Sequence, residues 1–287
     1  MNYLVTGGAG FIGSNLVRSL MNYGKVTVID NLSTGNIQNI QSFINNDGIK
    51  FENISITNLS QIKPVFKDID YVFHLAAIPN VGRSVNDPLR SHEVNATGTL
   101  NVLISARDND VKKIIYSSSS SVYGNTPELP KKETMKPKPL SPYAVTKLTG
   151  EHYCNVFSDI YGLKTVSLRY FNVYGPNQDP HSEYSAVIPK FITKILRDER
   201  PTIYGDGNQT RDFTYVKDVV NANLLAMKND SEGIFNIAGG KRISINELFK
   251  KISTTLGKDI PPVYGKPRKG DIRDSLADIS KAKQYLE

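Results

Sequence analysis

Tyr143 and Lys147 lie four residues apart in the segment Ser-Pro-Tyr-Ala-Val-Thr-Lys. On a helix this spacing places both side chains on one face, one turn apart. A free phenol titrates near ~10 and is a poor base at neutral pH, but an adjacent ammonium group favours the phenolate and lowers its pKa. The pair therefore predicts a proton acceptor for an alcohol. Because a chain of 287 residues with 15 tyrosines offers such spacings by chance, the prediction needs support from elsewhere in the sequence.

A glycine-rich segment near the N-terminus gives that support. Residues 2–6 are typical of a short buried strand, and Gly7, Gly10 and Gly13 follow it as G-x-x-G-x-x-G before a predicted helix over residues 14–22. Glycines permit the tight strand-to-helix turn, the approach of a pyrophosphate to the backbone and close packing of helix on strand. The free amides of the helix N-terminus would bind the pyrophosphate. A glycine-rich turn that binds nothing is the alternative.

The next predicted strand, residues 25–30, weakens that alternative because it ends in Asp30, about 17 residues past Gly13. A carboxylate at this point accepts hydrogen bonds from the adenosine ribose hydroxyls and repels a 2′-phosphate. The segment from Asn31 to Asn36 contains neither Arg nor Lys. The sequence therefore predicts dinucleotide binding, with NAD favoured over NADP.

Composition sets wider limits. The length fits one large domain or two intimate ones, and no apolar run approaches the ~20 residues that span a bilayer. A strand that begins at residue 2 leaves no room for a signal peptide, so we expect a cytoplasmic protein without a membrane partner. The single cysteine, Cys154, excludes an internal disulfide and a Cys-rich metal site; we expect a packed thiol and no metal.

The net charge of +7 and the pI near 9.2 are compatible with a nucleic-acid binder. The basic residues are scattered, however, and the densest run, between Lys131 and Lys138, is interrupted by Pro and Glu. We therefore expect a solvated surface and no nucleic-acid partner. Some of the positive charge could serve a phosphorylated small molecule.

Strand-like and helix-like segments alternate through the first two thirds of the chain, which predicts an α/β fold with a doubly wound parallel sheet. Further strands are expected at 50–54, 71–75, 113–118 and 165–169, and helices at 59–66, 87–108 and 142–161. The pattern changes after residue 172, where we expect a helix (189–197), short strands (202–204, 213–216, 234–238) and two more helices (218–227, 245–256). We predict a dinucleotide-binding domain over 1–172, to which about 213–238 returns, and a mainly substrate-binding domain over 173–287.

Taken together, the motifs resemble the extended short-chain dehydrogenases/reductases that act on nucleotide sugars, over nearly the full length of the chain. The matching segments are Thr6–Gly13, His74–Ala77, Ser117–Gly124, Tyr143 with Lys147, and Arg169–Pro176. The resemblance implies a Rossmann-type sheet with a smaller, interleaved C-terminal α/β substrate domain, and a homodimer built through helices 87–108 and 142–161. The likeness is closest to the UDP-hexose 4-epimerases, which implies a UDP-sugar substrate and NAD.

The resemblance also implies roles for individual residues. By this resemblance Tyr143 is the base, and Lys147 lowers the pKa of Tyr143 and anchors the ribose. Ser119 supplies the hydroxyl that bonds the 4-oxygen of the sugar. The implied cofactor-binding residues are Gly7, Gly10, Phe11, Ile12, Gly13, Asp30, Asn31, Ser33, Gly35, Ser55, Ile56, Leu75, Ala76, Ala77, Asn95, Ser117, Tyr143, Lys147 and Tyr170. The implied substrate-binding residues are Val81, Arg83, Ser119, Ser120, Tyr143, Asn172, Ala186, Val187, Tyr204, Arg211, Ile245, Arg268, Asp271 and Ser275. Surface ion pairs are the alternative for Arg211 and Arg268.

The chain departs from the family pattern at Ser55, where relatives often carry an acid that bonds adenine. Dehydratases of the superfamily carry an Asp-Glu pair after the catalytic hydroxyl, because elimination of water needs a further acid and base. Here Ser120 and Ser121 occupy those places. Epimerisation through a 4-keto sugar is therefore favoured. A dehydratase or reductase with another product, and a non-catalytic NAD sensor, stay open as alternatives.

The preferred sugar depends on one position. In the resembling epimerases a residue near the C-terminus limits the pocket, and the matching residue here is Ser275. A small side chain leaves volume for a 2-acetamido group, whereas a tyrosine would exclude it. The segments 182–189 and 81–84 also resemble the branch that accepts N-acetylhexosamines. We therefore predict interconversion of UDP-GlcNAc and UDP-GalNAc, with UDP-glucose/UDP-galactose activity alongside; a UDP-glucose 4-epimerase proper is the alternative.

Overall fold

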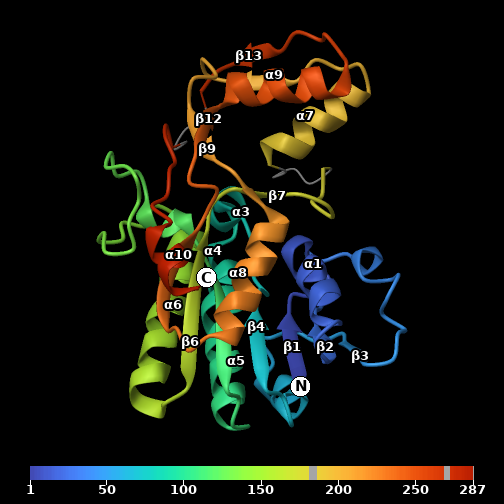
Figure 1. The fold of residues 1–287 in the computed structure, drawn as a ribbon, viewed down its shortest axis with the longest axis vertical. Helices are drawn as coiled ribbons and strands as arrows, with labels where there is room; N and C mark the ends of the chain where they lie inside the picture. Colours follow the sequence, from blue (N-terminus) through green and yellow to red (C-terminus); the bar gives the residue numbers. More distant parts are fainter. Residues whose placement is uncertain (181–185, 268–271, 287) are drawn as a thin grey trace.

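A seven-stranded parallel sheet forms the centre of the protein in this computed structural model, which describes residues 1–180, 186–267 and 272–286 (Figure 1). The strand order is β11-β6-β5-β4-β1-β2-β3. The strands are β1 (Asn2–Thr6), β2 (Lys25–Ile29), β3 (Ile49–Glu52), β4 (Tyr71–His74), β5 (Lys113–Ser119), β6 (Lys164–Tyr170) and β11 (Gly233–Ile237). The chain moves outward from β1 to β3, then returns to β4 on the other side of β1. This reversal of direction opens a crevice at the carboxyl ends of β1 and β4.

Helices cover both faces of the sheet, as a doubly wound fold requires. One face carries α1 (Phe11–Leu20) and α8 (Val216–Lys228), and the other carries α2 (Leu59–Ile62), α5 (Gly98–Arg107) and α6 (Pro142–Tyr161). The prediction of a Rossmann-type sheet is confirmed.

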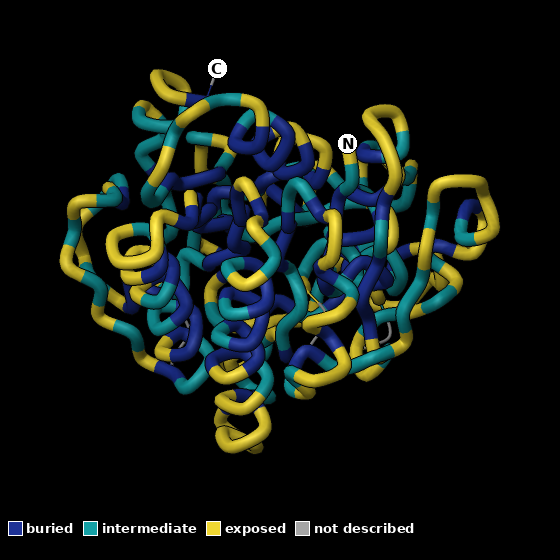
Figure 2. Tube along the Cα trace, turned by 90° about the horizontal axis from the view of Figure 1, so that it is seen from below, coloured by how far each residue is buried: buried dark blue, intermediate teal, exposed yellow. Residues whose placement is uncertain are grey.

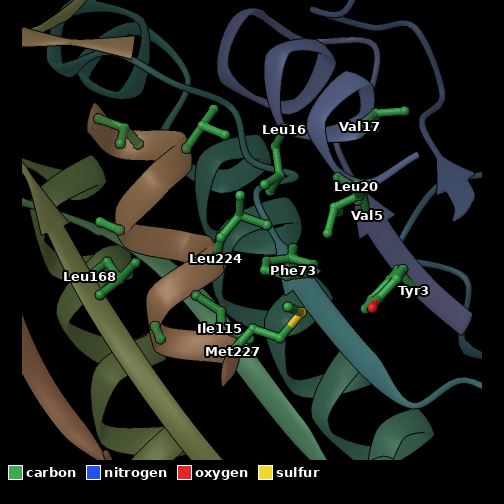
Figure 3. Packing of buried hydrophobic residues seen from close by; sticks show 14 of the residues in the cluster. Tyr3, Val5, Leu16, Val17, Leu20, Phe73, Ile115, Leu168, Leu224 and Met227 are labelled. Carbon is green, nitrogen blue, oxygen red and sulfur yellow. The ribbon is translucent and has the colours of Figure 1, made fainter. Parts of the chain in front are cut away.

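Alternation along β1 shows how one strand serves both layers. Tyr3 and Val5 pack with Leu16 and Leu20 of α1 (Figure 3), whereas Leu4 packs against the layer formed by α5 and α6. Successive side chains of a strand point to opposite faces, so a strand buried on both sides must be apolar throughout. Figure 2 shows the buried residues gathered in the interior, while exposed residues follow the outer loops.

Several helices differ from their predicted bounds. The helix expected over 87–108 is divided into α4 (Pro88–His92), a π-helical turn over Glu93–Thr97, and α5. The helix expected over 59–66 changes to a 3₁₀ turn at Lys63–Phe66, because Pro64 lacks the amide that would continue the helix. Helix α1 begins at Phe11 rather than at residue 14, and α3 (Val81–Asn86) was not predicted at all.

Short strands after β6 form three two-stranded sheets in the described residues: β10 (Thr214–Tyr215) pairs with β7 (Val173–Tyr174), β12 (Arg242–Ser244) with β9 (Thr210–Asp212), and β13 (Val263–Gly265) with β8 (Thr202–Tyr204). Two helices, α7 (Val187–Leu196) and α9 (Ile245–Leu256), pack against each other through a core that includes Phe191 and Leu248. The helix α10 (Ser280–Tyr285) lies against β11. Figure 1 shows α7, α9 and β13 beyond the carboxyl ends of the large sheet.

Helix α9 has the bounds that the sequence predicted, because both ends are marked by local signals. Ser244 and Glu247 form a capping box at its start, and Gly257 adopts a left-handed conformation at its end. No helix in residues 1–180, 186–267 or 272–286 is long and apolar enough to cross a bilayer.

Candidate active site

A cavity of about 1120 Å³ opens at the carboxyl ends of the large sheet. Its walls come from the turn after β1, the segments after β2, β3 and β4, the end of β5, the first turns of α6, and residues 177–180. It therefore occupies the crevice where the strand order reverses, which is the usual ligand site in open α/β sheets.

The turn between β1 and α1 is shaped to bring a ligand close to the backbone. Gly7 has a φ of +73°, in the region that favours glycine. A Cβ at Gly13 would lie 2.1 Å from the carbonyl oxygen of Gly7, so only glycine allows α1 to start this close to β1. The amides of the first turn, beginning at Phe11, face the cavity end of α1 and suit a pyrophosphate.

Asp30 is fixed beside this turn. Its Oδ2 accepts a hydrogen bond from the amide of Ala9 at 2.9 Å, and its Oδ1 accepts one from the amide of Leu32 at 2.8 Å. Burial raises the pKa of Asp30, and the two backbone bonds oppose that increase. A Cβ on Gly35 would stand 2.8 Å from Oδ2, so the facing loop comes as near to the carboxylate as a main chain can. The glycine turn and this carboxylate fit the pyrophosphate and ribose of NAD.

The first turn of α6 carries Tyr143. Ser141 caps the helix through the amide of Ala144, Pro142 occupies the first helical position, and the amide of Tyr143 donates to Ser84 Oγ at 3.0 Å. One turn later, Lys147 Nζ donates to the carbonyl of Ser117 at 2.7 Å. The ammonium nitrogen is 6.0 Å from the centroid of the Tyr143 ring.

The electrostatics of the pair differ from the sequence-based expectation. Burial raises the pKa of Tyr143, and only the hydrogen bond with Ser119 acts to lower it. Burial also lowers the pKa of Lys147 to about 8, against the opposing influence of Cys154 and Glu151. The expected lowering of the phenol's pKa by Lys147 is therefore not found. Desolvation of the phenolate is the larger influence on Tyr143, and the ammonium group of Lys147 is directed at the Ser117 carbonyl instead.

Most of the predicted cofactor residues line this cavity: Gly7, Gly10, Phe11, Ile12, Gly13, Asp30, Asn31, Ser33, Gly35, Ser55, Ile56, Leu75, Ala76, Ala77, Ser117, Tyr143, Lys147 and Tyr170. Asn95 does not. It accepts from the amide of Ile78 at 2.7 Å and donates to the same residue's carbonyl at 3.1 Å, so it holds the segment after β4 in place. Arg83, predicted for the substrate, also lines this cavity.

A second cavity of about 640 Å³ adjoins the first and shares Pro180 with it. Six predicted substrate residues line it: Asn172, Ala186, Val187, Tyr204, Arg211 and Ile245. Three basic residues in the same wall were not predicted from the sequence. They lie on α7 or directly after it: Lys190, Lys194 and Arg197. Their spacing along a helix could have indicated a shared face. Arg268, Asp271 and residues 182–185 lie outside the described residues.

The other predicted substrate residues of the described chain line neither cavity: Ser119, Ser120, Ser275 and Val81. Ser119 accepts from the amide of Ser121 at 3.2 Å, so it caps the 3₁₀ turn Ser120–Tyr123 while bonding Tyr143. Asn172 Nδ2 lies 3.4 Å from Ser275 Oγ. Val81 is exposed on α3.

The segment 174–180 follows the domain boundary that the sequence predicts at residue 172. In the structure it meets the glycine turn: Asn177 Nδ2 donates to Ser14 Oγ at 3.0 Å, and Asn15 Nδ2 donates to the carbonyl of Pro176 at 3.0 Å. Residues 177–180 thereby form a wall of the first cavity. Its Pro, Gly and Asn content marked a loop but carried no signal for what the loop touches.

Comparison with known proteins gives matches over almost the whole chain. The model of the NAD dependent epimerase/dehydratase family matches residues 3–238. A UDP-N-acetylglucosamine 4-epimerase from Methanobrevibacter ruminantium M1, solved with UDP-N-acetylmuramic acid, is 47% identical with a TM-score of 0.97, covering 100% of this chain and 91% of that one.

Two UDP-glucose 4-epimerases are also similar to the chain. The Thermotoga maritima structure, solved with UDP-glucose, is 44% identical with a TM-score of 0.95, covering 100% of this chain and 92% of that one. The protein from Mycolicibacterium smegmatis is 39% identical over 295 residues, covering 100% of this chain and 92% of its own length. The comparisons support a UDP-sugar 4-epimerase activity with NAD as the cofactor.

Proposed function

The chain belongs to the NAD dependent epimerase/dehydratase family, and from this premise we propose that it interconverts UDP-GlcNAc and UDP-GalNAc, with UDP-glucose and UDP-galactose as secondary substrates. One observation carries the choice of sugar. Ser275 has a small side chain, and its Oγ lies 3.4 Å from Nδ2 of Asn172, which lines the second cavity. A tyrosine at this position would take up space beside Asn172 that a 2-acetamido group would need. The similarity to a UDP-N-acetylglucosamine 4-epimerase at 47% identity agrees with this choice.

The cavities supply places for both parts of the reaction. The larger takes NAD, with Asp30 on the adenosine ribose and the first turn of α1 on the pyrophosphate. The smaller takes the uridine diphosphate, where Arg211 and the cations of α7 complement the phosphates. Asn172, in the wall of the smaller cavity, would contact the diphosphate. The sugar would then reach Tyr143 in the wall of the first cavity.

In the proposed mechanism Tyr143 accepts the proton of the 4-hydroxyl group and later returns it. Ser119 bonds the 4-oxygen of the sugar and Tyr143 at the same time, so it holds the proton path together. Lys147 is fixed by the carbonyl of Ser117 and anchors the ribose beside the nicotinamide. NAD, when bound, would supply the acceptor for the hydride of C4, and its reduced form would supply the hydride that is added to the opposite face of the ring. Rotation of the sugar about its link to the diphosphate exchanges the two faces.

The run Ser119-Ser120-Ser121 favours this reaction over elimination. No carboxylate follows the catalytic hydroxyl, and Ser121 Oγ is buried without a hydrogen-bond partner in the described part of the chain. Loss of water from C5 and C6 would need an additional acid and base at this place. Reversible removal of a hydride from C4 needs no acid or base in addition to Tyr143.

We also propose that residues 1–172 with 213–238 form the dinucleotide-binding domain, and that the remainder of 173–287 binds the nucleotide sugar. The pairing of β11 with β6 supports the return of 213–238 to the large sheet.

We further propose a homodimer built on α6, because the apolar side chains of Val145, Val156 and Ile160 on that helix are exposed. Light scattering of the purified protein would detect a monomer, if the proposal is wrong.

The proposed function is tested by proton NMR of the purified protein with UDP-GlcNAc and with UDP-glucose in parallel, without added cofactor. We expect the anomeric signal of UDP-GalNAc to appear faster than that of UDP-galactose, with no change of mass. The Tyr143→Phe variant should bind UDP but lose turnover by about 10²–10⁴-fold. Conversion of UDP-glucose alone would assign the narrower specificity, and a product of altered mass would refute epimerisation.

A further inference from the structure

A buried ion pair lies next to the catalytic residues, and the mechanism above does not use it. Glu151 is on α6 and Arg169 is on β6, with side chains 1% and 2% exposed. Arg169 Nε donates to Glu151 Oε1 at 2.8 Å, and Nη2 donates to Oε2 at 2.7 Å. The guanidinium also lies over the ring of Tyr123, 4.7 Å from its centroid.

Stability alone does not account for such a pair. Two charges lose their hydration when they are buried, and well-packed apolar residues of the same volume are often as stable or more so. A pair held with two short parallel hydrogen bonds does, however, fix geometry, because a guanidinium and a carboxylate meet in one plane. Its neighbours therefore indicate what it positions.

The pair is attached to the end of β5 that carries the active-site serines. Ser118 Oγ donates to Glu151 Oε1, so the middle residue of the run Ser117–Ser119 is anchored to α6. On one side of Ser118, the carbonyl of Ser117 receives the hydrogen bond of Lys147. On the other side, Ser119 is hydrogen-bonded to Tyr143. A displacement of Ser118 would therefore move both contacts.

The pair also places a charge close to Lys147, since Glu151 follows it by four residues on the same helix. The titratable and charged groups that face Lys147 from the elements around it are Tyr143, Glu151 and Cys154 on α6, His74 on β4 and Tyr116 on β5, with Arg169 on β6 behind Glu151. Burial lowers the pKa of His74 to about 3 and raises that of Cys154 to about 12, so both are neutral near pH 7. Glu151, paired with Arg169, is the carboxylate of this group in the described residues.

Resting on the proposed function, we propose that Glu151 and Arg169 are positioning residues: their ion pair holds Ser117–Ser119 against α6 and sets a fixed negative charge one turn from Lys147. The consequence is twofold. The geometry of the Tyr143–Ser119 contact depends on the pair, and so does the pH at which Lys147 loses its proton. Glu151 acts to raise the pKa of Lys147, whereas burial lowers it.

The test uses Glu151→Gln, which keeps the shape of the side chain and removes its charge. We expect kcat to fall by about 10- to 100-fold, because a small misplacement of catalytic groups has effects of this size, with little change in the KM for the nucleotide sugar. Without the carboxylate, Lys147 loses its proton at lower pH. The alkaline limb of the activity profile should therefore move down by about one pH unit.

A direct measurement separates this proposal from the proposed function. In protein labelled with ¹³C at lysine Cε, the resonance of Lys147 is identified by its disappearance in Lys147→Met, and it is titrated without substrate. We expect its midpoint to fall in Glu151→Gln. This result requires no turnover, so it would stand even if no nucleotide sugar were epimerised.

Lys113→Met is the matched control. Lys113 begins β5, is buried, and donates to the carbonyls of Ala226 and Asn229 at 2.9 and 2.8 Å, far from the serine run. Its replacement removes a buried charge from the same strand, so it should lower stability without moving the Lys147 midpoint or the activity profile.

If Glu151→Gln does not fold, the double variant Glu151→Gln/Arg169→Met decides the question, because it leaves no unpaired buried charge. We expect the folded double variant to keep the low kcat and the lowered Lys147 midpoint. Wild-type values of both quantities, in either folded variant, would overturn the proposal.

Discussion

Replacement of Ser119 by alanine should move the acid limb of kcat/KM to higher pH. Tyr143 accepts a proton only as the phenolate, and burial raises its pKa while the hydrogen bond from Ser119 lowers it. In Ser119→Ala only burial acts on Tyr143, so the pKa of its phenol rises further. A larger part of the enzyme then carries a protonated, inactive Tyr143 at neutral pH.

The size of the shift follows from the strength of one contact. A hydrogen bond to a charged group contributes about 1.5–3 kcal/mol, and one pKa unit corresponds to about 1.36 kcal/mol. The limb should therefore move by about one to two units. At a pH below both limbs this lowers kcat/KM by about 10- to 100-fold. Recovery at alkaline pH is limited by Lys147, whose pKa burial lowers to about 8.

The assay is kcat/KM for UDP-GlcNAc between about pH 5.5 and 9.5, for the parent protein, Ser119→Ala and a matched control. Ser121→Ala serves as the control, because Ser121 Oγ has no partner in the described residues, while its amide still donates to position 119 in the parent geometry. We expect the control to keep the parent limb. An acid limb that keeps its parent midpoint in Ser119→Ala, whatever the overall loss of rate, would refute the argument that this hydroxyl lowers the pKa of Tyr143.

Three further predictions concern the cofactor, the sugar and the fold. Asp30→Asn should weaken NAD binding by about 10- to 100-fold and reduce the preference over NADP, because the ribose loses a charged acceptor; unchanged binding in a fluorescence titration would contradict this. Ser275→Tyr should lower kcat/KM for UDP-GlcNAc about 10- to 200-fold more than for UDP-glucose, and equal losses would remove Ser275 from the choice of sugar. His74 stays neutral in the folded protein down to about pH 3, whereas the unfolded chain protonates it below about pH 6.5. The free energy of unfolding should therefore decrease as the pH is lowered below 6.5, and at pH 5 it should be about 2 kcal/mol smaller than at neutral pH. Urea titrations of His74→Gln, which cannot bind this proton, should lack that loss.

Local signals explain which parts of the site the sequence could predict. The turn at Gly7, the carboxylate of Asp30 and the spacing of Tyr143 and Lys147 each depend on a few adjacent residues, and all of them line one cavity. The bounds of α9 were likewise predicted because both caps are local. Asn95 shows the limit: the resemblance implied a cofactor contact, whereas in the structure its side-chain amide bonds the backbone of Ile78.

Contacts between residues that are far apart in the chain could not be predicted from the sequence. The Tyr143 amide meets Ser84, 59 residues away, on a helix that the pattern did not predict. The segment at Asn177 meets Ser14 of α1, 163 residues away. Such contacts depend on strand order and register, which no local pattern contains.

The serine run at the end of β5 shows why polar residues inside an enzyme are hard to interpret from sequence. A polar run after an apolar strand usually indicates a turn, yet β5 continues to Ser119, and Ser117 and Ser118 are buried. Buried hydroxyls must find partners, and here they find Tyr170, Glu151 and Tyr143 on β6 and α6. The same hydrogen bonds that make burial tolerable also fix the groups around the reacting carbon. We therefore expect the polar core of this protein to change rate and pH dependence, when mutated, more than the apolar core of similar burial does.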